Sequence, residues 1–193
     1  MAEPLVTLAS NDFALFGVPA QFAQDRAAID ARWKDLQREA HPDRFAAQGA
    51  ATQRQAMQWS VRINEAYQRL KDPLRRAAYL CELGGMPIQA ESNTAMPAEF
   101  LLQQMEWREA LDDAQREADI DALHTAVMAA REQVLAECAQ ALDVQHDLAR
   151  AVSLVRALMF LERFGADIEK RYDQLPASPA FAATVVTAPG SAG

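Results

Sequence analysis

The feature that most constrains the fold is the spacing of apolar residues, which recur at intervals of three and four along most of the chain. Between residues 25 and 40, steps of four, three and four separate Ile29, Trp33, Leu36 and Ala40. Residues spaced in this way lie on one face of an α-helix. Alanine is abundant, and only 7 of the 193 residues are glycine. Spacing and composition together predict an all-α protein.

Capping and breaking residues divide the chain into helical runs. We expect a short helix around residues 11–16, closed by Gly17, and further helices at 25–40, 50–71, 74–83, 97–117, 119–143 and 145–173. Pro42 disfavours helical geometry at His41, so the second run should end there and a loop should reach to about Gly49. The helically spaced face of the third run is expected to carry Met57, Val61, Asn64 or Ala66, Tyr67 and Leu70.

Charge is distributed unevenly along the chain. Residues 1–90 carry a net charge of +1 and residues 91–193 carry −9, which together give the overall −8. This asymmetry predicts two modules with different partners. We expect a helical module at 10–85, a linker at 86–95, a three-helix bundle at 96–174 and a disordered tail at 175–193.

Several function classes find no support in the sequence. The acidic balance argues against a general nucleic-acid binder, because phosphate contacts require an excess of Lys and Arg. Cys81 and Cys138 lie far apart without a histidine pair, so we expect reduced thiols, no metal and a cytoplasmic protein. No nucleophile pairs recognisably with a histidine and no phosphate loop is present, so we expect neither an enzyme nor a cofactor.

The tripeptide His41-Pro42-Asp43 lies between two helical runs. Pro42 stiffens the backbone, which would display Asp43 to an arginine of a partner and leave His41 to donate and accept hydrogen bonds. Beside the tripeptide, a positive stripe suited to an acidic partner is expected to comprise Arg26, Arg32, Lys34 and Arg38. A helix-capping turn and a solvated helix face remain the alternatives for these two features.

Residues 100–118 combine two apolar faces on one helical run. The expected bundle-facing stripe comprises Phe100, Gln104, Trp107, Leu111, Ala114 and Ala118. The opposite side mixes three apolar and three acidic residues, namely Leu101, Leu102, Met105, Glu106, Glu109 and Asp113. Apolar residues rimmed by charge are typical of a protein-binding patch. Packing of the three apolar side chains on a neighbouring helix or on the first module remains the alternative.

The tripeptide and its context resemble the J-domain. It precedes Ile63-Asn64-Glu65-Ala66-Tyr67 and Asp72-Pro73-x-Arg75-x-x-x-Tyr79, in the order typical of J-domains. The run Phe100-Leu101-Leu102-x-Gln104-Met105-Glu106-x-Arg108-Glu109 resembles the first C-terminal helix of HscB-type co-chaperones. Asp12-Phe13-x-Leu15-Phe16-Gly17-x-Pro19 matches the same group, and the resemblance covers residues 11–173.

The resemblance implies an L-shaped, two-domain co-chaperone with its J-domain at 10–85. The J-domain would bind an HscA/DnaK-type chaperone ATPase and stimulate ATP hydrolysis, through His41, Pro42, Asp43, Arg32, Lys34 and Arg38. The C-terminal bundle would bind an IscU-type iron–sulfur scaffold through Leu101, Leu102, Met105, Glu106, Glu109, Asp113 and Phe160.

Three departures from the family pattern are visible in the sequence. Arg44 follows the tripeptide where lysine is common, and Asp113 stands where glutamate is usual. The N-terminal cysteine pair of some relatives is missing, so no zinc is expected. Two other functions remain open, a general J-domain co-chaperone that delivers unfolded clients and a helical assembly protein that self-associates through its acidic bundle.

Overall fold

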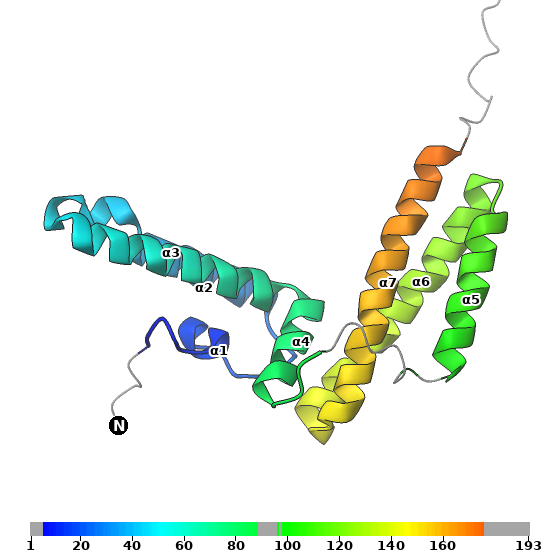
Figure 1. The fold of residues 1–193 in the computed structure, drawn as a ribbon, viewed down its shortest axis with the longest axis horizontal. Coiled ribbons are helices and arrows are strands. Elements are labelled where there is room, and N and C mark those ends of the chain that lie inside the picture. The colour runs from blue at the N-terminus through cyan, green and yellow to red at the C-terminus, as the bar shows by residue number, and fades with distance from the viewer. Residues whose placement is uncertain (1–5, 89–95, 97, 176–193) are drawn as a thin grey trace, which may run out of the picture.

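The computed structural model describes residues 6–88, 96 and 98–175, and its regular structure is entirely helical within these ranges. The prediction of an all-α protein is confirmed. Figure 1 shows a helical hairpin, α2 and α3, that runs across the view to a corner at α4, while α5, α6 and α7 extend away from this corner as a bundle. The outline is that of an L. The expected linker at 86–95 and tail at 175–193 lie mostly outside the described residues.

Four α-helices form the N-terminal part of the chain. They are α1 (Asp12–Phe16), α2 (Arg26–Glu39), α3 (Ala50–Lys71) and α4 (Pro73–Leu83). Asn11, Asp25 and Asp72 cap three of them, because their side-chain oxygens accept first-turn backbone N–H groups at 2.8–2.9 Å. These bounds agree with the predicted runs to within about two residues, since the capping residues that define them are local in sequence.

The seam between α2 and α3 is apolar, and α1 covers one part of it. Its buried residues are Phe13, Leu15, Phe16, Ile29, Leu36, Ile63, Ala66 and Leu70. The predicted face of α3 was wrong in its first half, because Met57 and Val61 are more than half exposed whereas Ala56 and Ile63 are buried. Two apolar stripes run along α3, and helical spacing alone does not indicate which of them faces α2.

A buried carboxylate ties α1 to α3. Asp12 is fully buried, and its two oxygens lie 2.6 Å from Arg62 Nη2 and 2.7 Å from Arg69 Nη1. Its backbone N–H also donates to the hydroxyl of Tyr79 in α4 at 3.1 Å. A carboxylate removed from water needs such partners to offset the loss of its hydration. Asp12 therefore fixes the position of α1 over the hairpin.

Three helices form the C-terminal bundle. They are α5 (Ala98–Asp113), α6 (Glu117–Ala139) and α7 (Leu148–Gln174). The break between the first two lies at 114–116 and not at the predicted Ala118-Asp119. Asp119 belongs to the new helix, where its carboxylate accepts the N–H of Arg116 at 3.2 Å. Ala118 therefore lies on α6, where it is exposed, and it is not part of the α5 stripe.

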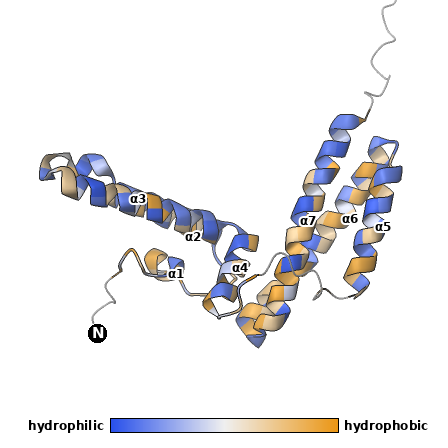
Figure 2. Cartoon of the chain, viewed as in Figure 1, coloured by the Kyte–Doolittle hydropathy of each residue, from blue (hydrophilic) through white to orange (hydrophobic). Residues whose placement is uncertain are grey.

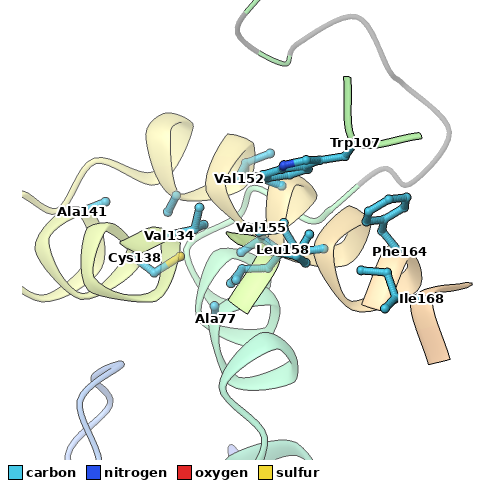
Figure 3. Close-up of a cluster of buried hydrophobic side chains, with 14 of the residues drawn as sticks. Ala77, Trp107, Val134, Cys138, Ala141, Val152, Val155, Leu158, Phe164 and Ile168 are labelled. Atoms are coloured by element: carbon cyan, nitrogen blue, oxygen red, sulfur yellow. The ribbon is translucent and has the colours of Figure 1, made fainter. Parts of the chain in front are cut away.

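The two parts of the molecule share one hydrophobic core at the corner. Ala77 and Cys81 of α4 are fully buried against side chains of the bundle, among them Val155 of α7. Figure 3 shows Ala77 facing Leu158 and Val155 within this cluster. Gly84 permits the close approach, because a Cβ at this position would lie 2.5 Å from Leu148 Cδ1. The corner is thus a packed interface and not a bare hinge.

Polar contacts reinforce the corner. Asp143 lies in the π-helical turn η3 (Gln140–Gln145), which continues α6, and its carboxylate accepts the N–H groups of Phe22 and Ala23 at 2.6 and 2.8 Å. Arg76 of α4 donates to the carbonyl of Phe22 at 2.7 Å and lies over the Phe22 ring. The α1–α2 connection is therefore held from both sides, by α4 and by the bundle.

Replacing Asp12 tests its contribution to the fold. We expect Asp12→Ala to lower the free energy of unfolding by about 2 kcal/mol, because two partly buried arginines lose their shared partner. The exposed pair of Asp35 and Arg38 provides the matched control. Asp35→Ala should cost at most about 0.5 kcal/mol. Urea unfolding monitored by circular dichroism measures both changes in the free energy of unfolding. Equal losses in the two variants would contradict the role given to Asp12.

The two cysteines report on the integrity of the corner. Burial raises the pKa of the Cys81 thiol to about 11. The pKa of Cys138 is raised to about 12, mainly by burial and secondly by the nearby Cys81. At about pH 8, roughly 0.1 % of Cys81 or less is therefore thiolate, the reactive form. We expect Ellman's reagent to label neither thiol of the native protein within minutes and both in denaturant. Rapid labelling of the native protein would show that the corner opens.

Candidate functional site

The His41-Pro42-Asp43 turn lies at the end of the hairpin that is far from the bundle. The predicted loop is in fact a short 3₁₀ helix, η1 (Pro42–Gln48), because Pro42 supplies the backbone angle of a first helical position. His41 Nδ1 accepts the N–H of Asp43 at 3.3 Å, so this ring caps η1. The Asp43 side chain is 88% exposed and approaches only His41 Nδ1, at 3.6 Å, within the described residues.

This geometry separates the roles of the two polar residues of the turn. His41 fulfils the capping alternative, since it satisfies a backbone donor of η1. A neutral ring that accepts at Nδ1 carries its proton on Nε2, which is then a donor. Within the described ranges the Asp43 side chain accepts no backbone N–H, and it displays an acceptor to solvent. A partner protein can therefore bind the Asp43 carboxylate without breaking a contact that holds the turn together.

The basic residues of α2 do not form a single stripe. Arg32 and Lys34 are two residues apart, which turns the helix by about 200°, so they point to nearly opposite sides. Lys34 and Arg38 are exposed on the outward side, and Arg38 is anchored by Asp35. Arg32 is half-buried on the other flank. Near the start of α2, the hydrogen bond from Arg26 holds the pKa of Asp30 below its usual value.

An apolar pocket lies along α2 and α3 next to the turn. Its volume is about 400 Å³, and Leu36, Phe45, Trp59 and Ile63 are among its lining residues, with Arg32 at the same opening. Phe45 of η1 brings this pocket against the turn, a neighbourhood that the sequence analysis missed. The available signal was Phe45, the one aromatic side chain of the expected loop between the two helical runs apart from the His41 ring.

The predicted patch on α5 is gathered on one outward face. Met105 is 67% and Leu102 61% exposed, while Leu101 is half-buried. The three carboxylates, of Glu106, Glu109 and Asp113, are all exposed. Trp107 and Leu111 on the opposite side are buried, and Figure 2 shows the hydrophobic residues of α5 concentrated in its N-terminal part. The alternative in which Leu102 and Met105 pack on a neighbouring element of the described chain is excluded.

Phe160 lies on α7 beside α5, where it is half-buried. Its ring packs at 5.8 Å against Phe100, at 6.4 Å against Trp107 and at 5.5 Å against Phe164. Figure 3 shows Trp107 of α5 above the helix that carries Phe164. Offset and edge-to-face ring pairs of this kind contribute beyond their buried area. Phe160 therefore supports α5 with one part of its ring and leaves another part at the surface.

Neither a metal site nor a membrane-spanning helix is found among the described residues. No group of three or more His, Cys, Asp or Glu side chains in this part of the chain is arranged to hold a metal ion. Among the described helices, none has the length and apolar character needed to cross a membrane. The described surface presents three features that could meet a partner, namely the exposed carboxylate turn, the apolar pocket beside it and the mixed apolar and acidic face of α5.

A family model described as the HSCB C-terminal oligomerisation domain matches residues 96–169. A co-chaperone protein HscB homolog from Burkholderia multivorans is 47% identical over 174 residues, which cover 89% of this chain and 99% of that protein. A homolog of the same name from Bordetella petrii is 47% identical over 161 residues, covering 83% and 95%.

Solved structures give the same result. Chaperone HscB from Vibrio cholerae superposes with a TM-score of 0.76 at 36% identity, covering 86% of this chain and 100% of that chain. The human co-chaperone protein HscB superposes with a TM-score of 0.81 at 26% identity, covering 86% and 84%. The likeness therefore extends over the hairpin as well as the bundle.

Proposed function

Because the chain belongs to the HscB family of co-chaperones, we propose that it brings an IscU-type iron–sulfur scaffold to an HscA/DnaK-type ATPase and stimulates ATP hydrolysis by that ATPase. The protein would catalyse no reaction itself. It would act by binding one conformation of the ATPase more tightly than the other, which shifts the partner's populations. We place this activity in the cytoplasm, where the free buried thiols of Cys81 and Cys138 would remain reduced.

The exposed carboxylate of Asp43 supports the ATPase part of the proposal. It stands on a stiff turn, and a partner's guanidinium can pair with it through charge-assisted hydrogen bonds. Lys34 and Arg38 lie on the outward side of α2 and would meet acidic residues of the same partner. Arg32 would contact that partner from the other flank, beside the apolar pocket.

The outward face of α5 supports the scaffold part of the proposal, and it is the observation that carries the specific function. Leu102 and Met105 expose apolar area that no described element covers, and carboxylates surround this area. Such a composition fits a partner with an apolar patch bordered by basic residues. Leu101 and the surface part of Phe160 would extend the contact toward α7.

The packed corner supports delivery of cargo. The turn is carried by the hairpin and the cargo face by the bundle, and α4 joins the two through a shared core. Tightly packed interfaces transmit position because they do not deform continuously. The scaffold would therefore be presented to the ATPase at a set distance from Asp43.

Loss of the capping imidazole tests the ATPase part. We expect His41→Gln to reduce stimulation of the cognate ATPase at least tenfold, because the partner-facing geometry of the turn is lost. Binding of the scaffold should remain within twofold of the original protein, since the turn is remote from α5. Steady-state ATPase assays and calorimetric titration of the scaffold measure the two effects. Undiminished stimulation by His41→Gln would contradict this part of the proposal.

Truncation of the apolar residues on α5 tests the scaffold part. We expect the double variant Leu101→Ala/Met105→Ala to weaken scaffold binding by about 1–3 kcal/mol for each residue. Stimulation of the ATPase without scaffold should not change. Calorimetric titration measures the affinity, and thermal unfolding checks that the bundle remains folded.

Two outcomes would favour other functions. Unchanged scaffold binding together with intact delivery of an unfolded client would favour a general client-delivering co-chaperone. The description of the matching family model favours self-association of the bundle as the second candidate. Light scattering of the chain alone addresses it, because a stable oligomer that hides Leu102 and Met105 would contradict scaffold binding at this face.

A further inference from the structure

Arg108 occupies a special position on the outward face of α5. It is exposed, and it lies three residues after Met105 and seven after Leu101, so the three side chains share one side of the helix. Its guanidinium carbon lies 5.7 Å from the centroid of the Phe160 ring. This separation is within the range of a cation–π contact. Arg108 therefore lies between the apolar patch of α5 and the exposed part of Phe160.

The guanidinium of Arg108 has no carboxylate partner in the part of the chain that the structure describes, where its contact is the Phe160 ring. A guanidinium is planar and carries five N–H donors, and a ring beside it occupies none of them in a conventional hydrogen bond. A side chain already held against a ring also loses less rotamer freedom on binding than a free one would. The fork is thus arranged in advance for a carboxylate of an incoming protein.

The surroundings of Arg108 are otherwise acidic. Exposed carboxylates within about two helical turns of it belong to Glu106, Glu109, Asp112 and Asp113. On α5, a partner's acidic group would be repelled at each of these positions and attracted at Arg108, which is the one basic residue of this helix. Arg108 thus stands among carboxylates, next to the apolar residues of α5 that a partner must cover.

We infer that Arg108 is a specificity-determining residue of this face, which pairs with one carboxylate that the bound scaffold places beside its own apolar patch. The inference rests on the proposed function and adds the chemistry of one contact to it. The scaffold surface would then be basic apart from one acidic side chain. Because that side chain has only one favourable position, its pairing with Arg108 sets the register of the complex along α5.

Charge reversal tests the contact. We expect Arg108→Glu to weaken binding of the cognate IscU-type scaffold at least about tenfold, measured by calorimetric titration of the full-length chain. Arg108→Lys keeps the charge but loses the planar fork, so it should lose less affinity. In the scaffold, each exposed Asp or Glu is replaced by Lys in turn. One of these replacements should restore at least half of the binding energy lost in Arg108→Glu, which a purely structural role for Arg108 would not produce.

Two control variants accompany the test. Arg75→Glu makes the same change of net charge at an exposed position on α4, and it should bind the scaffold within twofold of the original protein. Leu101→Ala removes an apolar side chain of the same face, so its loss of affinity tests whether the scaffold binds there. Thermal unfolding of Arg108→Glu should show a folded bundle, and stimulation of the ATPase without scaffold should be unchanged.

The outcomes distinguish the inference from the function on which it rests. Normal affinity of Arg108→Glu together with weak binding by Leu101→Ala would overturn the inference and leave the proposed function standing. Weak binding that no scaffold replacement restores would also overturn it, because Arg108 would then act only by orienting Phe160. If the original protein itself binds no scaffold, the proposed function fails and the inference fails with it.

Discussion

The shared core at the corner of the molecule is the constraint on which the rest of the structure depends. Ala77 and Cys81 of α4 are packed against the bundle. The Asp143 carboxylate accepts hydrogen bonds from the backbone N–H groups of Phe22 and Ala23 in the α1–α2 connection. A hairpin and a three-helix bundle joined only by a connecting segment would sample many relative positions. Here apolar packing and hydrogen bonds act together, so the turn at Asp43 and the face of α5 belong to one body.

The sequence predicted the elements well wherever a local signal defined them. Three predicted helices begin within two residues of the caps Asn11, Asp25 and Asp72, because a cap acts within the first turn and is local in sequence. The exposed stripe of Met57 and Val61 was assigned to the wrong side, because spacing does not identify the partner of an apolar face. The sequence also did not predict the contacts at the corner, for a related reason. The contact between Phe22 and Asp143 joins residues 121 positions apart, and nothing local marks either of them.

The candidate sites were predictable to different degrees. The exposure of Asp43, Leu102 and Met105 agrees with the expected surfaces, since a stiff turn and an apolar stripe opposite a core stripe both leave local patterns. The dual position of Phe160, half in an aromatic cluster, depends on how α5 crosses α7. The contact of Arg108 with this ring depends on the same crossing. Contacts of this kind follow from tertiary packing and not from the pattern of a single helix.

The exposure of Leu102 and Met105 has a consequence for how such a protein can evolve. Side chains that face solvent contribute little to folding, so substitutions at these positions leave the bundle intact. Substitutions at these positions can accumulate without the loss of stability that limits changes at the buried Trp107 or Leu111. A surface of this kind can therefore diverge between lineages while the architecture that carries it stays the same.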